Sequence, residues 1–181
     1  MRKQTAKYTQ YYGDLSVTVF APRFYYSKSQ KKDEYSKQIV FGKFQDLSDY
    51  FFEPVKNVFA KLPFIPDLIV VAPSSKIGAF SPTLNSLASR LSKVYGVPHV
   101  NVIERIREGK KLTNCPHLEE RHKEIDGAFK VIVSMKGLKV VLLDDTKTTG
   151  LTSLECAKEL KTAGVLVIMA VCLGINRVKK K

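Results

Sequence analysis

The sequence predicts an α/β domain with a mainly parallel, twisted sheet that is flanked by helices. Several short runs are almost entirely apolar, as strands are when helices cover both faces of a parallel sheet. These runs alternate with segments of helical periodicity, which is the order expected of such a sheet. A length of 181 residues with 44% apolar side chains suffices for one domain with its own core.

The N-terminal part combines short strands with a helix. Residues 15–30 predict two short strands around Ala21 and Pro22. Residues 41–62 are amphipathic and predict a helix, in which Pro54 is either a break or a new first turn.

A buried strand at 67–73 is followed by a helix with clear end signals at 81–96. Ser81 can cap this helix, Pro82 suits its first turn, and Gly96 can end it. One face of the helix collects its apolar residues, which are Leu84, Leu87, Ala88, Leu91 and Val94.

The C-terminal half supplies most of the sheet. Further strands are predicted at 97–103, 128–133, 139–144 and 165–173. The segment 104–126 is long, charged and poorly periodic. Residues 152–164 predict a helix whose inner side carries Leu151, Leu154, Ala157 or Lys158, and Leu160.

The composition restricts the partners and the compartment. A net charge of +13 favours anionic partners, such as phosphorylated small molecules, nucleic acid or acidic proteins, although a lysine-rich surface explains it as well. Three scattered cysteines indicate a reducing compartment, so we expect a cytoplasmic protein. The start of the sequence shows no signal peptide, and the longest apolar segment, 165–175, is too short for a membrane span.

The most informative stretch is "KVVLLDDTKTTGLTS", where an apolar strand ends in Asp144 and Asp145 and a helical pattern follows. Backbone amides at a helix N-terminus bind phosphate, and small residues let the backbone approach it. Adjacent carboxylates suit hydroxyl groups or a metal instead. A ribose 5-phosphate would suit both the carboxylates, through its hydroxyl groups, and the turn, through its phosphate. Its phosphate would contact the turn formed by Thr148, Thr149, Gly150, Leu151 and Thr152.

This stretch resembles the phosphoribosyl-pyrophosphate (PRPP) motif of type I phosphoribosyltransferases. The segment "LEERHKEIDGAFKV" is similar to one in ComF-like competence proteins, through Arg121, Ile125 and the Gly127-Ala128-Phe129 run. The resemblance implies a type I phosphoribosyltransferase-like fold with a small N-terminal β/helical hood region. On this basis we expect one domain, with hood and first helix at 1–62 and the core sheet at 63–181.

The resemblance also implies the ligands and their contacts. Asp144 and Asp145 would hold the ribose of PRPP, and Mg²⁺ would be held mostly through the substrate. Ser74, Ser75 and Lys76 would form the pyrophosphate loop. Cations of the charged segment, which resembles a hood loop, would approach the leaving group; these are Arg105, Arg107, Lys110 and Lys111.

The chain departs from the family pattern at three points. Thr146 stands where Val or Ile is usual, and the Arg-Gly-Phe-Asn-Gln pattern of ComF-like proteins is missing after the first strand of the core. Thr148 stands where 6-oxopurine transferases carry an Asp. The acceptor base is therefore not specified by the sequence.

Two functions follow. The first is a phosphoribosyltransferase that transfers the 5-phosphoribosyl group of PRPP to a nitrogenous base and releases pyrophosphate. The second is a non-catalytic module on the same fold that senses PRPP or a nucleotide, or assists DNA uptake or processing. Nucleic-acid binding and a homodimer are compatible with both.

Other candidate residues have simpler explanations. Cys115, His117 and His122 are spaced as C-x-H-x4-H, but a zinc site needs a further ligand. His99 fits a core or rim position. Aromatic residues interleaved with cations either stack on single-stranded nucleic acid or belong to the core; they are Tyr8, Tyr11, Tyr12, Tyr25 and Tyr26.

Overall fold

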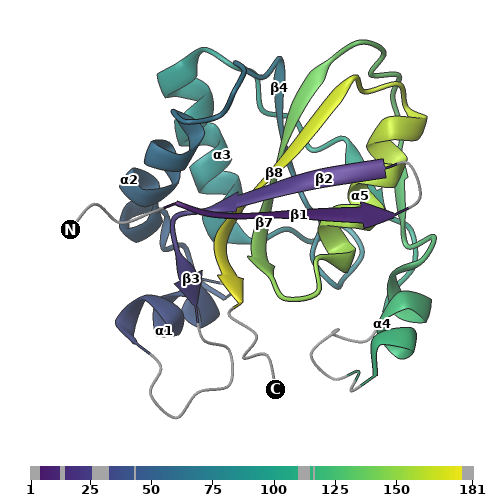
Figure 1. Cartoon of the computed structure of the whole chain (residues 1–181), viewed down its shortest axis with the longest axis horizontal. Coiled ribbons are helices and arrows are strands. Elements are labelled where there is room, and N and C mark those ends of the chain that lie inside the picture. Colours follow the sequence, from purple (N-terminus) through teal and green to yellow (C-terminus); the bar gives the residue numbers. More distant parts are fainter. Residues whose placement is uncertain are drawn as a thin grey trace.

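In the computed structural model, the apolar runs form the centre of a six-stranded sheet (Figure 1). The structure describes residues 5–12, 15–25, 33–42, 44–109, 115 and 117–176, with Tyr12 and Leu118 described by their backbone alone. The strands of this sheet are β1 (Ala6–Tyr12), β2 (Leu15–Ala21), β3 (Phe24–Tyr25), β4 (Leu68–Val71), β7 (Lys139–Lys147) and β8 (Val167–Asn176).

The sheet has the order β1-β2-β8-β7-β4, and β3 also pairs with β8. Strands β2, β3 and β7 run parallel to β8, β4 runs parallel to β7, and β1 is antiparallel to β2. The predicted α/β fold with a mainly parallel sheet is thereby confirmed. The N-terminal strands extend this same sheet at one edge, and the division of the domain at residue 62 stays a prediction.

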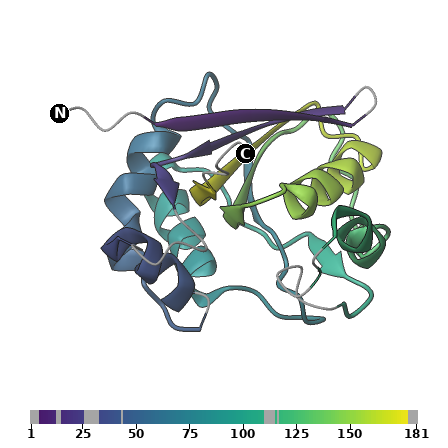
Figure 2. The ribbon, with the colours of Figure 1, turned by 60° about the horizontal axis from the view of Figure 1, so that its bottom comes forward.

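Helices cover both faces of the sheet (Figure 2). Three helices lie on one face: α1 (Glu34–Phe41), α2 (Ser48–Phe59) and α3 (Pro82–Tyr95). The other face is covered by α5 (Leu151–Thr162), beside which lie α4 (Leu118–Ile125) and a small antiparallel sheet of β5 (Ile103–Arg105) and β6 (Phe129–Val131).

Strand β7 is buried on both faces. Val140 and Leu142 pack into the core beneath α5, whereas Val141 and Leu143 pack into the core beneath α2 and α3. All four side chains are at most 1% exposed. This explains why the run reads as continuously apolar, since successive side chains of a strand point to opposite faces.

The end signals of α3 are confirmed. The Ser81 side chain accepts a hydrogen bond from the Leu84 N–H, Pro82 is the first helical residue, and Gly96 ends the helix with φ +66°. Val94 was expected on the buried face but is 55% exposed, because the helix turns it away from the sheet.

Several elements differ from the prediction. Helix α2 begins at Ser48 instead of residue 41, α4 forms within the segment 104–126, where no helix was predicted, and β6 belongs to the small sheet instead of the main one. Strand β1 was not predicted. Helix α2 continues through Pro54, because its apolar residues, among them Phe51 and Val55, are buried in the core and offset one lost hydrogen bond. The run 97–103 contributes only an isolated bridge between Ile69 and His99 before β5 begins.

None of the helices in the described part of the chain has the length and apolar character that a membrane crossing requires.

Candidate functional site

The carboxyl ends of β4 and β7 lie side by side. Val71 is paired with Leu143, and the N–H of Ala72 donates a 2.9 Å hydrogen bond to the Leu143 carbonyl. The loop that follows β4 and the turn that follows β7 therefore emerge at the same edge of the sheet. In open α/β sheets ligands bind beyond this edge, so the predicted pyrophosphate loop and acid pair are brought together.

The first acid of the pair is turned inward. Asp144 is 6% exposed, and its Oδ2 accepts a 2.7 Å hydrogen bond from the Ser153 hydroxyl in the first turn of α5. Its Oδ1 accepts from the Asp145 N–H at 2.8 Å. Strand β7 continues past both acids to Lys147, three residues further than predicted.

The second acid lies nearer the surface. Asp145 is half-buried, and its Oδ1 accepts a hydrogen bond from the Thr146 hydroxyl at 3.2 Å. Mg²⁺ prefers carboxylate oxygens and keeps several waters. The donor chemistry of Asp145 fits a magnesium ion held largely by a ligand, whereas both oxygens of Asp144 already accept hydrogen bonds within the protein.

The threonine turn leads directly into α5. Gly150 adopts φ +84° and caps the helix without a side-chain hydrogen bond, and the Leu151 N–H is 3.5 Å from Thr149 Oγ1. The amides of Thr149, Gly150 and Thr152 donate to no residue among those described. These donors and the positive end of the helix dipole make the turn suitable for an anion.

Strand β1 covers this turn, which the sequence did not predict. The Nε2 of Gln10 donates a buried 2.8 Å hydrogen bond to the Gly150 carbonyl. A Cβ at position 150 would lie 1.9 Å from the Gln10 side-chain oxygen and would displace that side chain, and the φ of +84° also favours glycine. On the other side of the turn, the hydroxyls of Tyr25 and Thr148 are 3.2 Å apart.

Lys147 lies beneath the same strand. Its side chain is 7% exposed, and its Nζ is 3.2 Å from the centroid of the Tyr8 ring. Burial lowers the pKa of Lys147, and the neighbouring Cys172 thiol opposes this effect. The sequence does not indicate that Lys147 is buried, because a lysine next to a turn is equally typical of an exposed position.

The predicted pyrophosphate loop is short and partly ordered by its own hydrogen bonds. The Ser74 N–H donates to the Ala79 carbonyl at 2.8 Å, and the Lys76 N–H is 3.3 Å from Ser74 Oγ. Ser74 and Ser75 are half-buried, while Lys76 is exposed. The side chain of Lys76 is therefore accessible to an anion at this edge.

Arg105 connects this loop to the small sheet. It is 6% exposed; its Nη1 lies 3.4 Å from the Ser74 carbonyl and its Nε donates to the Arg107 carbonyl at 2.8 Å. Its guanidinium group also lies over the Phe129 ring, 5.2 Å from the centroid. Burial first, and then the Arg107 charge, lower the pKa of Arg105.

The guanidinium group of Arg107 binds backbone carbonyls at the C-terminal end of α4. Its Nη2 donates to the carbonyls of Lys123 and Asp126 at 3.1 and 2.9 Å. Arginine side chains satisfy the last carbonyls of a helix in this way. The remaining predicted cations, Lys110 and Lys111, lie outside the described residues.

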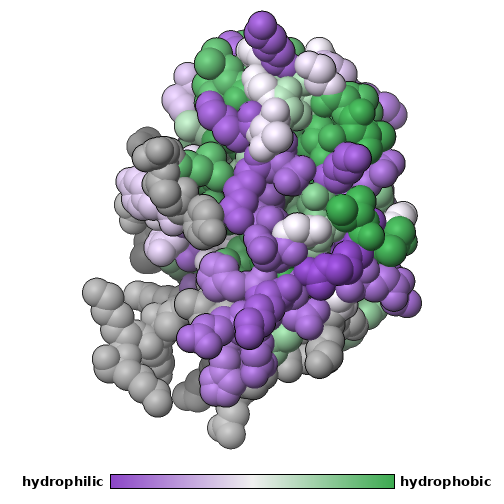
Figure 3. Space-filling model, turned by 90° about the vertical axis from the view of Figure 1, so that its right-hand side faces the viewer, coloured by the Kyte–Doolittle hydropathy of each residue, from purple (hydrophilic) through white to green (hydrophobic). Residues whose placement is uncertain are grey.

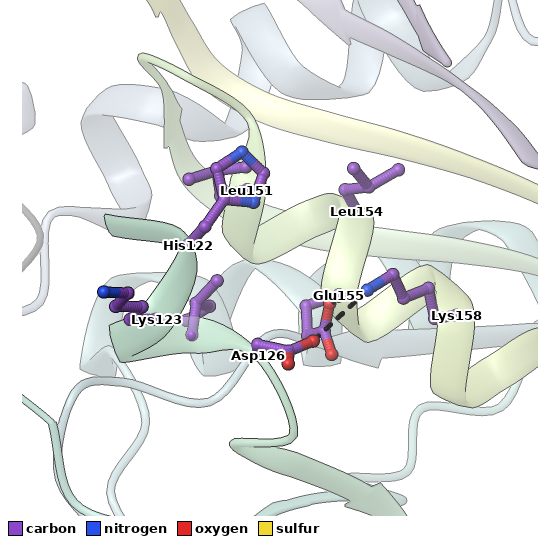
Figure 4. A pocket seen from close by; sticks show the side chains of 8 residues that line it. His122, Lys123, Asp126, Leu151, Leu154, Glu155 and Lys158 are labelled. Carbon is purple, nitrogen blue, oxygen red and sulfur yellow. Dashed lines mark ion pairs between the residues drawn. The ribbon is translucent and has the colours of Figure 1, made fainter. Parts of the chain in front are cut away.

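A pocket of about 210 Å³ separates α4 from α5 (Figure 4). Glu155 lies in its wall, where its carboxylate accepts from the Gly127 N–H at 3.1 Å and pairs with Lys158 at 2.7 Å. Lys158 also lies 3.6 Å from Asp126. The pocket reaches the turn only through Leu151, and hydrophilic side chains prevail on the surface over α4 (Figure 3).

The cysteines and histidines do not form a metal site within the described part of the chain, where no three metal-binding side chains cluster. Cys115 is buried, and its carbonyl accepts from Arg121 Nε at 2.7 Å. Cys156 and Cys172 are buried free thiols, and burial raises the pKa of both.

Comparisons with known proteins give matches among solved structures alone. No protein-family model and no curated protein matches the chain. An allosteric regulatory enzyme of purine biosynthesis is 17% identical with a TM-score of 0.44, covering 66% of this chain and 24% of that one. Glutamine PRPP amidotransferase from B. subtilis is 18% identical with a TM-score of 0.44, covering 66% and 25%. A purine phosphoribosyltransferase from Pyrococcus horikoshii Ot3 is 22% identical with a TM-score of 0.39, covering 77% and 74%.

The chain spans about a quarter of the length of the first two of these proteins.

Proposed function

We propose that the chain binds PRPP and transfers its 5-phosphoribosyl group to a nitrogenous base, with release of pyrophosphate. The observation that carries the proposal is the junction of β7 and α5. There the half-buried carboxylate of Asp145 is followed, after Thr146 and Lys147, by a turn in which the amides of Thr149, Gly150 and Thr152 have no acceptor among the described residues. A sugar phosphate needs both features, because its hydroxyls donate hydrogen bonds and its phosphate accepts them.

Each part of the ligand has a counterpart. The 5-phosphate would bind the amides of Thr149, Gly150 and Thr152. The ribose hydroxyls would donate to the acid pair, chiefly to Asp145, because both oxygens of Asp144 already accept hydrogen bonds. The pyrophosphate would lie toward the loop after β4, where Lys76 is exposed. Magnesium, when bound with the ligand, supplies positive charge that offsets the pyrophosphate charge.

The chain would accelerate the transfer mainly by orienting PRPP and the base. A lone pair of the base nitrogen forms the bond to C1 of the ribose while the bond from C1 to the pyrophosphate oxygen breaks, and the nitrogen then loses its proton. Positive charge develops on the ribose ring in the transition state. The Asp145 carboxylate and the fixed ligand position favour that state, because preorganised groups need no rearrangement as the charge develops.

A second candidate function is a non-catalytic module that binds PRPP or a nucleotide on the same site, including an accessory role in DNA uptake or processing. The observation that favours it concerns the two predicted cations on the charged segment. Both Arg105 and Arg107 donate to backbone carbonyls of the protein, so part of the hydrogen-bonding capacity of each guanidinium group is already used. Ligand binding would persist without turnover.

Thermal unfolding with PRPP and Mg²⁺ tests the site. A ligand of the folded state at a hundred times its Kd stabilises a protein by about 2.7 kcal/mol, which for a chain of this size raises the Tm by roughly 5–10 °C. We expect Asp145→Asn to remove this rise. Glu104→Gln, an exposed acid on β5, is the matched control and keeps it. An equal rise in Asp145→Asn would refute the site.

The phosphate turn is tested separately. Thr152→Val removes one hydroxyl from the turn, and Thr162→Val makes the same change at the other end of α5. We expect the ligand to raise the Tm of Thr152→Val less than that of wild type, and to raise the Tm of Thr162→Val as much as that of wild type. Pyrophosphate release with a panel of bases then separates the two functions, because a protein that binds PRPP but releases none with any base is a binding module.

A further inference from the structure

Lys147 is the last residue of β7 and directly precedes the threonine turn. Its side chain is 7% exposed and its Nζ lies over the Tyr8 ring at 3.2 Å. The Nζ forms no hydrogen bond or ion pair with any residue that the structure describes. Lys147 is therefore a covered cation whose charge is not balanced by these residues.

Such a position is unfavourable in the absence of an anion. Covering an ammonium group removes water contacts, and one contact with an aromatic ring replaces only part of them. Every fully covered side-chain nitrogen and oxygen among the described residues has a hydrogen-bond partner. The Nζ of Lys147 has none and thus keeps some accessible area. A covered charge without a balancing partner breaks the usual rules of packing, and proteins break such rules mainly at functional sites.

The geometry of β1 places this ammonium group beside the turn. Tyr8 and Gln10 are two residues apart on one strand, so their side chains point to the same face, about 7 Å apart. Tyr8 lies over the Nζ of Lys147, and Gln10 donates to the Gly150 carbonyl. Lys147 and the turn are therefore neighbours under one face of β1.

We infer that Lys147 is a further anion-binding residue, whose ammonium group faces the phosphate group of a sugar phosphate held by the turn. This inference rests on the proposed function and adds a residue to its site. The turn offers partial positive charge from its amides and from the end of α5, and Lys147 adds a full positive charge from β7. Tyr8 and Gln10 cover the site from β1 and limit its contact with water, which strengthens the attraction.

Calorimetric titration with ribose 5-phosphate tests the inference. Lys147→Met keeps the length of the side chain and removes its charge. Lys139→Met makes the same change at the first residue of β7 and is the matched control. We expect Lys147→Met to bind about tenfold to a hundredfold more weakly than wild type, as the loss of one charged hydrogen bond predicts. Lys139→Met keeps the wild-type affinity.

The outcomes separate the inference from the function on which it rests. If wild type and Lys147→Met bind ribose 5-phosphate equally, the role of Lys147 is wrong and the proposed function stands. If wild type binds neither ribose 5-phosphate nor PRPP with Mg²⁺, the role of Lys147 and the proposed function are both wrong.

A second measurement uses the wild-type protein and does not depend on the folding of a variant. An amine-reactive acylating reagent is applied with and without saturating ribose 5-phosphate, and the modified lysines are quantified by mass spectrometry. We expect the ligand to lower acylation of Lys147 severalfold and to leave Lys139 unchanged. Equal acylation of Lys147 in the presence of bound ligand would overturn the inference.

Discussion

The Ser153 hydroxyl donates a 2.7 Å hydrogen bond to the carboxylate of Asp144. Both residues are buried, at 0% and 6% exposure, so the bond ties the end of β7 to the first turn of α5. Asp145, the next residue along, is left as the half-buried carboxylate of the pair. Two acids that are adjacent in sequence thus lie in different environments, one internal and one toward the surface.

Ser153→Ala tests the internal role. The change leaves a buried carboxylate without one of its donors, which costs about 1–3 kcal/mol. We expect a fall of this size in the free energy of unfolding, measured by urea denaturation. Ser92→Ala, a half-buried serine of α3, is the control with little expected change. Equal stability of the two variants would contradict the role of Ser153.

Gly150→Ala tests the contact between β1 and the turn. Alanine at φ +84° is strained by about 1–2 kcal/mol, and its Cβ also meets the Gln10 side chain. Gly137 has a similar φ of +81° with no atom within 4 Å of an added Cβ, so Gly137→Ala measures the strain alone. We expect Gly150→Ala to lower the Tm more than Gly137→Ala does.

The clash itself is isolated in a Gln10→Ala background. Without the Gln10 side chain, the additional cost of Gly150→Ala relative to Gly137→Ala shrinks. A cost that is the same in both backgrounds would show that Gln10 does not restrict position 150.

Arg105→Met tests the connection between the small sheet and the loop after β4. Methionine retains much of the packing against Phe129 but cannot donate to the Ser74 and Arg107 carbonyls. We expect a loss of about 1–3 kcal/mol in stability and faster hydrogen exchange of the Ser74 amide. Lys130→Met, an exposed change on β6, is the control. Unchanged exchange at Ser74 in Arg105→Met would argue against this connection.

Acid stability tests the start of α1. Asp33 accepts from the Ser36 N–H at 2.9 Å and caps the helix. Hydrogen bonding to the Ser36 side chain and backbone, with the Arg23 charge, outweighs burial and lowers the pKa of Asp33. A lowered folded-state pKa stabilises the protein above the unfolded-state value of about 3.9. This stabilisation is lost as the pH falls through the folded-state value.

We therefore expect Asp33→Ala to cost about 0.5–2 kcal/mol at pH 7 and less as the pH falls below about 4. Chemical denaturation across this pH range measures the difference from wild type. A difference that stays constant down to pH 3 would rule out the charged form of Asp33 as the source of the stabilisation.

Local signals in the sequence predicted the elements that depend on local physics. The ends of α3 follow from Ser81, Pro82 and Gly96, because capping and left-handed geometry involve only neighbouring residues. The central strands follow from runs such as Val140 to Leu143, which are covered on both faces. The place of the acid pair at a strand-to-helix junction was predicted for the same reason.

Long-range pairing decided what was not predicted. The sequence of β1, AKYTQYY, has no regular alternation of apolar and polar residues, so it gives no sign that β1 pairs with β2 at the sheet edge. Gln10 and Gly150 are 140 positions apart, so no spacing signals their contact. Arg105 was expected near the leaving group because its segment resembles a hood loop, whereas its hydrogen bond to the Ser74 carbonyl depends on how β5 packs.

The contact between Gln10 and Gly150 also bears on how the protein is synthesised and handled. Gln10 precedes Gly150 by 140 positions, so the strand that completes the turn is synthesised before the turn itself. The turn therefore acquires its final shape only when the amino-terminal strand has docked. A purification tag placed directly before β1, or proteolysis within it, would act on the turn from a part of the sequence that is 140 positions away.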